Sequence, residues 1–433
     1  VKFHNGDEMT ADDVVFSFSD ERVFAGTQPD GGETLYADNF KPKTDKELPA
    51  GVPGVGRRLW PALRGVEAVD KYTVRFHNAS PDVTLEGRLI AFGSQIASRR
   101  AWDEAATYAD WANAPVTTGA YKVQEYRPDV SLTLVAHDDY WGGRPPLAEI
   151  RFLEVPEVAS RVNGLLSGEY DFACDLPPDQ LDAVRNTAGL EVQGSTILNH
   201  RIQVFDKVHP VLSDPLIRRA MTHSIDRQLI VNALWDGQTK VPAGLQFEFY
   251  DDMFIKGWTA PEFNLVKQSG YQGDAIPFRV LNNYYINQVS NAQIMVEMWK
   301  QAGLNVEIQM VENWGQVLED NDTRGIRDWS NSATFNDPVS SIVAQHGPNG
   351  LQQQRNEWSN VEMNELSNFM QKSTDRGARK KAFARMLEIT EREDPAFQVL
   401  HQNCVFTGMK SDLNWKAAPA FAMDFRADNW NAS

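Results

Sequence analysis

The sequence predicts an open α/β fold, and two strand–helix–strand units carry this prediction. In the first unit, apolar residues recur at helical spacing between two short strand-like runs, and Gly303 marks the end of the helix. Such a unit is normally parallel and right-handed. The second unit has the same order, and its helix ends at Gly168. The predicted elements are 278–282, 288–302 and 306–311 in the first unit, and 150–155, 157–168 and 170–174 in the second.

The first third of the chain is predicted to mix short helices with strands. Thr10, followed by acidic residues and an apolar face, predicts the start of an amphipathic helix. Repeated glycines and prolines from Thr27 to Pro61 predict a long irregular segment. Beyond it, alternating patterns predict strands at 69–78 and 131–136, and helical spacing predicts a helix at 102–113.

Clear helix-start signals mark the middle of the chain. Asp214 before Pro215 predicts the N-cap and first residue of one helix, and Asp226 predicts the cap of a second helix directly after it. Towards the end, the patterns predict a long amphipathic helix at 376–393 and a last strand at 397–406.

The amino-acid composition excludes some classes of function for this chain. The chain has 433 residues, 42% of them hydrophobic and 23% charged, which is enough for two or three domains of typical size. Its net charge of −17 argues against nucleic acid and anionic membranes as partners, because both require a basic surface. No run of residues approaches the ~20 apolar positions that span a bilayer.

Signatures of enzymes and metal sites are missing from the sequence. No GxSxG, HExxH, GxxxxGK[ST], GxGxxG or EF-hand loop occurs, and the 8 histidines are scattered. We therefore expect a protein that is not an enzyme, with no catalytic residue, metal or cofactor; a secreted hydrolase acting on the same ligand is the alternative. Cys174 and Cys404 are interpreted as two buried free thiols, with a long-range disulfide as the alternative.

Aromatic residues in polar surroundings give the best candidates for a ligand site. Among the 12 tryptophans, Trp314 and Trp329 lie beside Asn, Asp, Ser and Thr residues. Flat apolar faces combined with short polar groups are typical of small-ligand pockets. Packing in the core is the alternative for most tryptophans of the chain.

Several segments of the sequence carry a family resemblance together. They are FHNGDEMTADDVVFSF at 3–18, TTGAYKVQEYRP at 117–128, HDDYWGGRPPL at 137–147, LLSGEYDF at 165–172 and HPVLSDPLIRRAMTHSIDRQLIVNALW at 209–235. The last of these is the most specific. In this order and spacing, over nearly the whole chain, they resemble the extracellular solute-binding proteins of the oligopeptide, dipeptide and nickel importers, family 5.

This resemblance implies a two-lobed periplasmic-binding-protein fold with an additional α+β domain on the first lobe. It implies that residues 1–143 form the additional domain, that 144–239 and 405–433 form the first lobe, and that 240–404 form the second lobe. The N-terminal strands of the family are expected to be missing, which would leave the first lobe incomplete.

The function implied by the resemblance is that of the substrate-binding protein of an ABC importer. Such a protein would enclose a small ligand between its lobes by hinge closure and deliver it to a membrane permease. We expect it to be periplasmic, or anchored on the outer side of the cytoplasmic membrane. We also expect a monomer with no nucleic-acid partner.

The same resemblance indicates the ligand site and its chemistry. Trp314 matches a family tryptophan, and 328–338 resembles the pocket strand and loop that follow. Peptide-binding members carry an aspartate there, which holds the ammonium group of the ligand. The matching position is Thr334, whose hydroxyl supplies no charge to a desolvated ammonium. This match argues against an ordinary free-amino peptide and predicts a small peptide-like or hydroxyl-rich ligand, with an oligosaccharide or sugar conjugate as the alternative. The predicted ligand-binding residues are Trp314, Trp329, Asn331, Ser332, Thr334, Phe335, Asn336 and Asp337.

Overall fold

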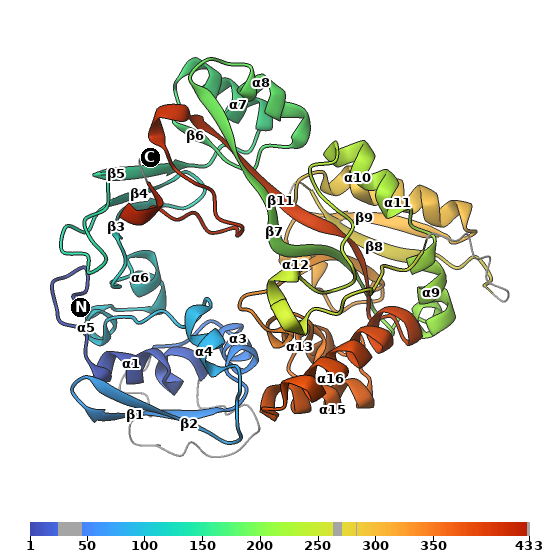
Figure 1. The fold of residues 1–433 in the computed structure, drawn as a ribbon, viewed down its shortest axis with the longest axis horizontal. Helices are drawn as coiled ribbons and strands as arrows, with labels where there is room; N and C mark the ends of the chain where they lie inside the picture. The colour runs from blue at the N-terminus through green and yellow to red at the C-terminus, as the bar shows by residue number, and fades with distance from the viewer. Residues whose placement is uncertain (25–45, 263–270, 283, 431–433) are drawn as a thin grey trace. The chain divides into compact units, whose positions relative to one another are not determined.

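The computed structural model describes residues 1–24, 46–262, 271–282 and 284–430, and the chain divides into two compact units (Figure 1). Unit 1 comprises Val1–Arg161, Asp412–Lys416 and Met423–Ser433. Unit 2 comprises Val162–Ser411 and Ala417–Ala422. Both units mix helices and strands, as the sequence patterns predict.

Unit 1 combines two small antiparallel sheets with short helices. Its strands are β1 (Leu63–Asp70), β2 (Thr73–Asn78), β3 (Tyr121–Arg127), β4 (Ser131–Ala136) and β5 (Glu149–Leu153), and its helices are α1 (Ala11–Ser17), α3 (Val52–Leu59), α4 (Leu85–Ile90), α5 (Arg99–Glu104) and α6 (Tyr108–Asn113), with short turns η1 (Asp20–Phe24) and η8 (Ala427–Asn429). Strands β1 and β2 form one sheet, and β3, β4 and β5 form the other. Helix α1 begins where predicted, because the carboxylate of Asp13 accepts a hydrogen bond from the backbone N–H of Thr10 at 2.9 Å.

Two elements that were predicted as continuous in unit 1 are each divided into two in the structure. The single strand expected at 69–78 is a hairpin, because a two-residue turn follows Asp70, whose carboxylate accepts from the N–H of Tyr72 at 2.9 Å. The single helix expected at 102–113 is two helices. Thr107 caps the second of them in a capping box and so starts a new helix. In both cases a short polar side chain binds nearby backbone and interrupts the longer element.

The irregular segment expected from Thr27 to Pro61 is wrong in its last part. Residues Val52–Leu59 form helix α3, and Pro53 lies in its first turn, where the missing N–H costs no hydrogen bond. Residues 27–45 of the expected segment lie outside the described residues.

Unit 2 is built on a six-stranded mixed sheet. Its strands are β6 (Phe172–Ala173), β7 (Leu190–Phe205), β8 (Ile276–Leu281), β9 (Val306–Val311), β10 (Ile326–Ser332) and β11 (Phe397–Lys410), in the spatial order β6-β11-β7-β10-β8-β9. Strand β8 pairs in parallel with both β9 and β10, whereas β7 runs antiparallel to β10 and β11. Helix α11 (Gln288–Gln301) connects β8 to β9, so the first predicted strand–helix–strand unit is confirmed as a parallel unit. The second predicted unit keeps its order, but its strands β5 and β6 belong to different sheets.

Among the other helices of unit 2, those that begin at Val158, Pro215, Arg227 and Arg376 start within one residue of the predicted positions, and the rest were not predicted. The α-helices are α7 (Val158–Ser167), α8 (Leu181–Arg185), α9 (Pro215–His223), α10 (Arg227–Trp235), α12 (Trp314–Val317), α13 (Ile342–His346), α14 (Leu351–Gln354), α15 (Val361–Lys372) and α16 (Arg376–Glu388), and the short 3-10 or π helices are η2 (Pro178–Gln180), η3 (Val211–Ser213), η4 (Glu248–Met253), η5 (Pro338–Ser340) and η6 (Ile389–Glu393). The 3-10 helix η7 (Ser411–Leu413) crosses from unit 2 into unit 1. Asp214 and Asp226 cap α9 and α10 through their carboxylates. The predicted helix 376–393 changes at Ile389 into the π-helix η6. This wider turn places Glu391 in the core, where it accepts from the N–H of Leu245 at 2.6 Å.

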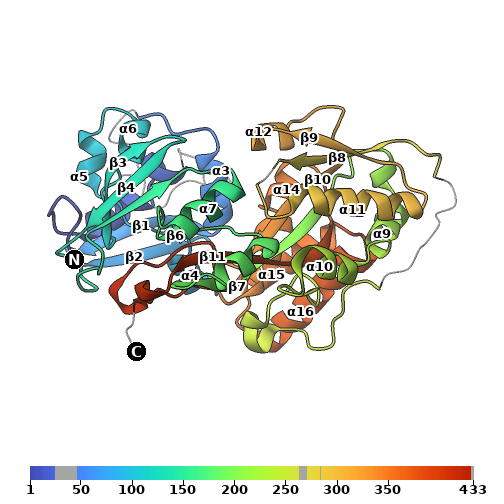
Figure 2. The ribbon, with the colours of Figure 1, turned by 90° about the horizontal axis from the view of Figure 1, so that it is seen from above.

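The two long strands β7 and β11 lie side by side and pair along most of their length (Figure 2). Gly194 of β7 has a φ of +119°, and a Cβ atom there would lie 2.0 Å from the carbonyl oxygen of Val405. Only glycine fits this close approach of the two backbones.

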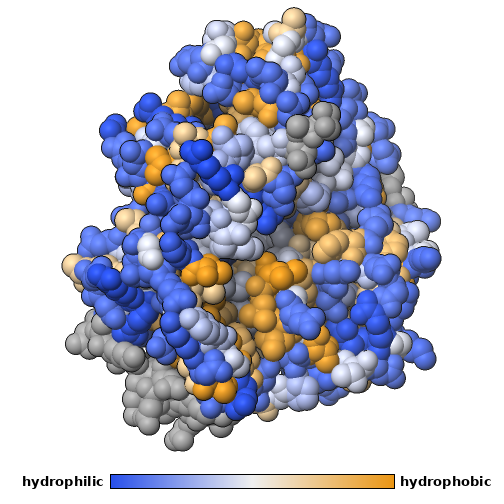
Figure 3. Space-filling view, turned by 60° about the vertical axis from the view of Figure 1, so that its left-hand side comes forward, coloured by the Kyte–Doolittle hydropathy of each residue, from blue (hydrophilic) through white to orange (hydrophobic). Residues whose placement is uncertain are grey.

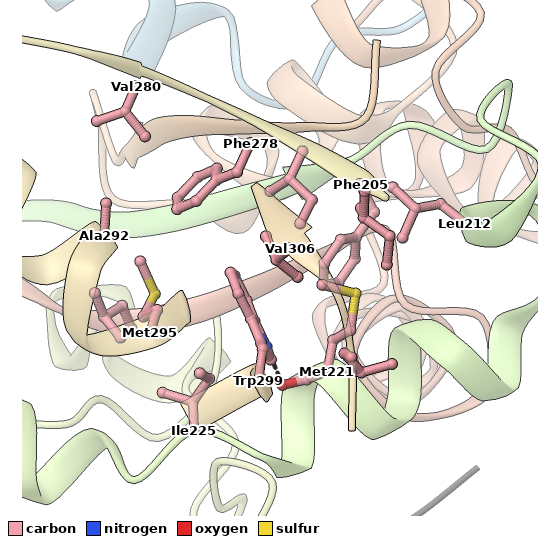
Figure 4. Close-up of a cluster of buried hydrophobic side chains, with 14 of the residues drawn as sticks. Phe205, Leu212, Met221, Ile225, Phe278, Val280, Ala292, Met295, Trp299 and Val306 are labelled. Atoms are coloured by element: carbon pink, nitrogen blue, oxygen red, sulfur yellow. Dashed lines mark hydrogen bonds between the residues drawn. The ribbon is translucent and has the colours of Figure 1, made fainter. Parts of the chain in front are cut away.

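The main core of unit 2 lies between the sheet and helices α9, α10 and α11 (Figure 4). The indole of Trp299 is buried at its centre, 5.6 Å from the ring of Phe278, and its Nε1–H donates to the carbonyl of Met221 at 3.0 Å. Strand residues Phe205, Phe278 and Ile326 contribute to this core, so this face of the sheet is mainly apolar. Any charged residue on it requires a separate explanation.

The surface shown in Figure 3 is mainly hydrophilic, and one of the two cysteines is buried. Hydrophilic side chains predominate on the face of the molecule shown in Figure 3, and hydrophobic ones gather in smaller groups. None of the helices in the described parts of the chain combines the length and apolar character needed to cross a membrane. Cys174 and Cys404 are not joined by a disulfide, so that alternative is wrong. Cys404 is buried, as predicted, and burial raises the pKa of its thiol to about 11, whereas Cys174 is only partly buried.

Candidate functional site

The tryptophans predicted to bind ligand lie at one edge of the unit 2 sheet. The carboxyl ends of the parallel strands β8, β9 and β10 meet at this edge. Tyr284 and Tyr285 follow β8, Trp314 follows β9, and Trp329 lies at the middle of β10. In open α/β sheets, ligands bind outside the carboxyl ends of the strands. The topology therefore brings three distant segments together at a place suited to a ligand.

The rings of Tyr284, Tyr285, Trp314 and Trp329 contact one another and are called here the aromatic cluster. Edge-to-face contacts join Trp314 to Trp329 at 4.6 Å between ring centres, and to Tyr284 at 4.7 Å. Asn313 caps helix α12 through its side chain and so fixes Trp314 at the first helical position. Both tryptophans are half-buried and Tyr284 is 59% exposed, which leaves ring surface available for contact.

A buried ion pair lies beside the aromatic cluster. Arg201 of β7 and Asp328 of β10 bind each other, and their side chains are only 1% and 2% exposed. Asp328 also accepts hydrogen bonds from the amides of Gln288, at 2.8 Å, and Gln203, at 3.4 Å. The guanidinium of Arg201 lies 3.5 Å from the centre of the Tyr285 ring. Burial raises the pKa of Asp328 and lowers that of Arg201, because each charged form loses solvation, while their mutual attraction opposes both shifts.

A second buried ion pair supports the cluster from the adjacent residue of β10. Arg327 lies with its guanidinium 4.3 Å from the centre of the Trp329 ring. It binds the carboxylate of Glu357 through Nε at 2.9 Å and through Nη2 at 2.8 Å. Burial acts to raise the pKa of Glu357, but Arg327 and Arg355 outweigh it and hold the pKa below its ordinary value. Trp329 therefore has a fixed cationic neighbour.

Neutral polar groups continue the site along the end of β10. The amide of Asn199 donates to the hydroxyl of Ser332 at 2.6 Å, and Asn403 in turn donates to Asn199. Asn331 donates to the carbonyl of Ser341 at 3.3 Å, and its Oδ1 is buried without a hydrogen-bond partner in the part of the chain that the structure describes. This region supplies donors and acceptors without net charge.

The loop that follows β10 separates into exposed and buried positions. Thr334 is half-buried and Asn336 is exposed, whereas Phe335 is 5% exposed. The carboxylate of Asp337 is buried and accepts hydrogen bonds from Nη2 of Arg379 at 2.7 and 2.8 Å. The negative charge of Asp337 is therefore neutralised inside the protein.

The histidines near these strands are neutral and do not form a metal site. Burial lowers the pKa of both His200 and His401 to about 3. The ring of His200 stacks on Phe247 with 3.9 Å between ring centres. Among the residues that the structure describes, no three His, Cys, Asp or Glu side chains are grouped so that they could hold a metal ion.

Sequence reasoning selected both tryptophans but missed the groups around them. Tyr284 and Tyr285 gave a usable signal, because adjacent tyrosines follow a predicted strand in NNYYINQ. Arg201 and Asp328 gave none, since their positions lie 127 residues apart and nothing local marks them as partners. Asp328 opens the segment 328–338 that was matched to the family's pocket strand, but neither residue was among the predicted ligand-binding residues.

Comparisons with known proteins agree with the architecture. A family model described as bacterial extracellular solute-binding proteins, family 5 Middle, matches residues 1–350. The probable ABC transporter periplasmic-binding protein SapA of Escherichia coli (strain K12) is 25% identical over 245 residues, which cover 55% of this chain and 41% of SapA. This match and two matches to peptide-binding relatives, at 58% each, cover roughly half the length of those proteins.

Solved structures extend the comparison to nearly the whole chain. The dipeptide binding protein from a Pseudoalteromonas species, in complex with Met-Leu, has a TM-score of 0.81 and 20% identity, covering 98% of this chain and 85% of that chain. The binding protein AgaA from A. tumefacien R10, in complex with agropinic acid, has a TM-score of 0.76 and 18% identity, covering 97% and 82%. This likeness confirms the predicted two-lobed binding-protein fold.

Proposed function

Because the chain belongs to the bacterial extracellular solute-binding proteins of family 5, we propose that it captures a small ligand outside the cytoplasmic membrane for an ABC importer. The single observation that carries this proposal is the family match over residues 1–350. The protein would act as a monomer, in the periplasm or anchored on the outer side of the membrane, and would pass its ligand to a membrane permease. The proposal involves no chemical step on the ligand.

The ligand that we propose is hydroxyl-rich, such as an oligosaccharide or a sugar conjugate. Flat aromatic surface at Trp314 and Trp329 suits the apolar faces of sugar rings, and Ser332 and Thr334 offer neutral hydrogen-bonding groups. A buried ammonium group without a carboxylate partner would cost several kcal/mol. Thr334 cannot supply that charge.

The carboxylates of the 328–338 segment support the same conclusion. Asp328 is bound to Arg201 and Asp337 to Arg379, and both are buried. Neither is free to bind the ammonium group of a peptide. The proposed contact set is Trp314, Trp329, Asn331, Ser332, Thr334, Phe335, Asn336 and Asp337. Its buried members Asn331, Phe335 and Asp337 would act through the strand end and the loop that they hold.

A peptide-like ligand is the second candidate, and the relatives favour it. SapA of Salmonella typhimurium carries the name of a peptide transport protein, and the Pseudoalteromonas structure contains Met-Leu. AgaA, by contrast, contains agropinic acid, so proteins of this fold are not restricted to peptides. The choice therefore depends on the side chains of this site, above all on Thr334.

Isothermal titration of the unmodified protein with maltotriose, Met-Leu and N-acetyl-Met-Leu tests the ligand class. We expect maltotriose to bind and Met-Leu to bind at least about tenfold more weakly. Thr334→Asp should strengthen the binding of Met-Leu about tenfold but not that of its acetylated form, since only the free ammonium can pair with the new carboxylate. Thr334→Asn is the matched neutral control and should change neither dipeptide.

Two results would contradict the hydroxyl-rich ligand. One is tight binding of Met-Leu by the unmodified protein, with an affinity that N-acetylation abolishes. The other is a free-amino peptide retained through purification and identified by mass spectrometry. Either result would support the peptide-like ligand instead.

A further inference from the structure

The buried pair of Arg201 and Asp328 is not explained by packing. It lies on the same face of the sheet as Phe205 and Ile326, which belong to the apolar core, and its polar strand neighbours on that face are Gln203 and Ser330. Replacing a buried ion pair with apolar side chains is often neutral or stabilising. Moreover, Nε and Nη1 of Arg201 are buried without hydrogen-bond partners among the described residues. A role other than stability therefore has to account for the pair.

Gln288 connects the pair to the aromatic cluster. Its side-chain Nε2 donates to Asp328 at 2.8 Å, and its Oε1 accepts from the backbone N–H groups of both Tyr284 and Tyr285 at 3.0 Å. The side chain is 2% exposed and lies at the first position of α11. One amide thus joins the buried carboxylate to the turn that carries both tyrosines.

Arg201 makes a second connection through the ring of Tyr285. The guanidinium lies 3.5 Å from the centre of that ring, and the ring's hydroxyl donates to Ser330 at 3.0 Å. Ser330 is the cross-strand partner of Arg201 in the pairing of β7 with β10. The tyrosine ring is therefore held at its face and at its tip by neighbouring residues of two strands.

We propose that Asp328 and Gln288 are positioning residues, which hold Tyr284 and Tyr285 against Trp314 before a ligand arrives. A contact surface that is ordered in advance does not lose further side-chain freedom on binding, and so binds more tightly. This inference deepens the proposed function and rests on it for the ligand, but the ordering of the two tyrosines can be measured without one.

Hydrogen exchange followed by mass spectrometry tests the ordering directly. In Asp328→Asn, the backbone amides of Tyr284 and Tyr285 should exchange about tenfold faster, because Gln288 loses the carboxylate that anchors it. Gln288→Met, which removes all three side-chain hydrogen bonds of Gln288 at similar side-chain volume, should have an equal or larger effect.

The matched control is Asp206→Asn. Asp206 pairs with Arg324 at 2.6 Å, with side chains 8% and 9% exposed, and the hydrogen bonds of its carboxylate go to Arg324 and to the N–H of Val208 rather than to the aromatic cluster. This variant should leave exchange at Tyr284 and Tyr285 unchanged. The proposal is overturned if Asp328→Asn and Gln288→Met, folded by circular dichroism, exchange as slowly as the unmodified protein, or if the control speeds exchange equally.

Titration separates this proposal from the proposed function. Whichever of maltotriose and Met-Leu binds the unmodified protein should bind about tenfold more weakly to Asp328→Asn and Gln288→Met, but not to Asp206→Asn. An unchanged affinity in the first two variants overturns the positioning role. If neither probe binds the unmodified protein, the ligand proposal fails, and the exchange experiment alone decides whether the tyrosines are positioned.

Discussion

Two buried ion pairs extend from adjacent residues of strand β10 to opposite faces of the sheet. Arg327 pairs with Glu357 on one face, and Asp328 pairs with Arg201 on the other. The first pair is 5% and 2% exposed and the second is 1% and 2% exposed, so burial hardly distinguishes them. The two pairs differ instead in the groups that bind each carboxylate.

The carboxylate of Glu357 is bound by two arginines, whereas that of Asp328 is bound by one arginine and two neutral amides. As a result, the pKa of Glu357 lies below its ordinary value despite burial, while burial raises the pKa of Asp328. Arg201 also leaves two nitrogen donors without hydrogen-bond partners among the described residues, and Arg327 leaves one. Two carboxylates that are equally buried can therefore have pKa values shifted in opposite directions. We interpret the Arg327–Glu357 pair as stabilising and the Arg201–Asp328 pair as positional.

The largest expected effect is at Glu357. Glu357→Gln should lower the free energy of unfolding by ~3–5 kcal/mol, because Arg327 would keep a buried charge that has lost its carboxylate. Urea unfolding measures the loss. The control is Glu362→Gln, which breaks the half-exposed pair with Arg385 and should cost less than ~1 kcal/mol. If Glu357→Gln lowers the free energy of unfolding no more than the control does, the Arg327–Glu357 pair is not stabilising.

A pair of double variants gives the next largest difference. Arg201→Met with Asp328→Leu should change the free energy of unfolding by less than ~1.5 kcal/mol, since apolar residues fit this face of the sheet. Arg327→Met with Glu357→Leu should cost more than ~2 kcal/mol, because Arg355 would lose its carboxylate and remain behind. Equal losses in the two double variants would show that the pairs do not differ in role.

Much of the fold that surrounds these pairs could be predicted because its signals are local. The alternation and helical spacing around α11 identify β8 and β9, and the carboxylates of Asp214 and Asp226 mark two helix starts. Each of these signals depends on residues within one turn or one strand. The structure confirms them with shifts of one or two residues.

The two ion pairs could not be predicted, because the partners of each pair are far apart in the sequence. Strand β7 runs for 16 residues with polar side chains on both faces, so its pattern does not alternate and no strand was expected there. Because β7 was not predicted, nothing in the sequence indicated which residues lie next to Arg201. In the same way, Trp329 could be selected by its surroundings in sequence, but the cation that contacts it is identified only by the sheet.

The smallest expected effect is a difference in the pH dependence of stability, and it compares the two carboxylates directly. A carboxylate with a lowered pKa, such as Glu357, stabilises the folded protein above the ordinary value of about 4.3, and this contribution is lost as the pH falls through the folded pKa. A carboxylate with a raised pKa, such as Asp328, does the opposite. Its contribution is present below the ordinary value of about 3.9 and is lost as the pH rises through the folded pKa.

Urea unfolding of the unmodified protein, Glu357→Gln and Asp328→Asn between pH 3 and pH 7 measures the two slopes. On acidification, the stability difference between the unmodified protein and Glu357→Gln should shrink, because protonated Glu357 resembles glutamine. The difference from Asp328→Asn should grow, by about 1.4 kcal/mol for each unit by which the folded pKa is raised. Slopes of the same sign would mean that Arg201 stabilises Asp328 as fully as Arg327 and Arg355 stabilise Glu357, and the distinction between the two pairs would be lost.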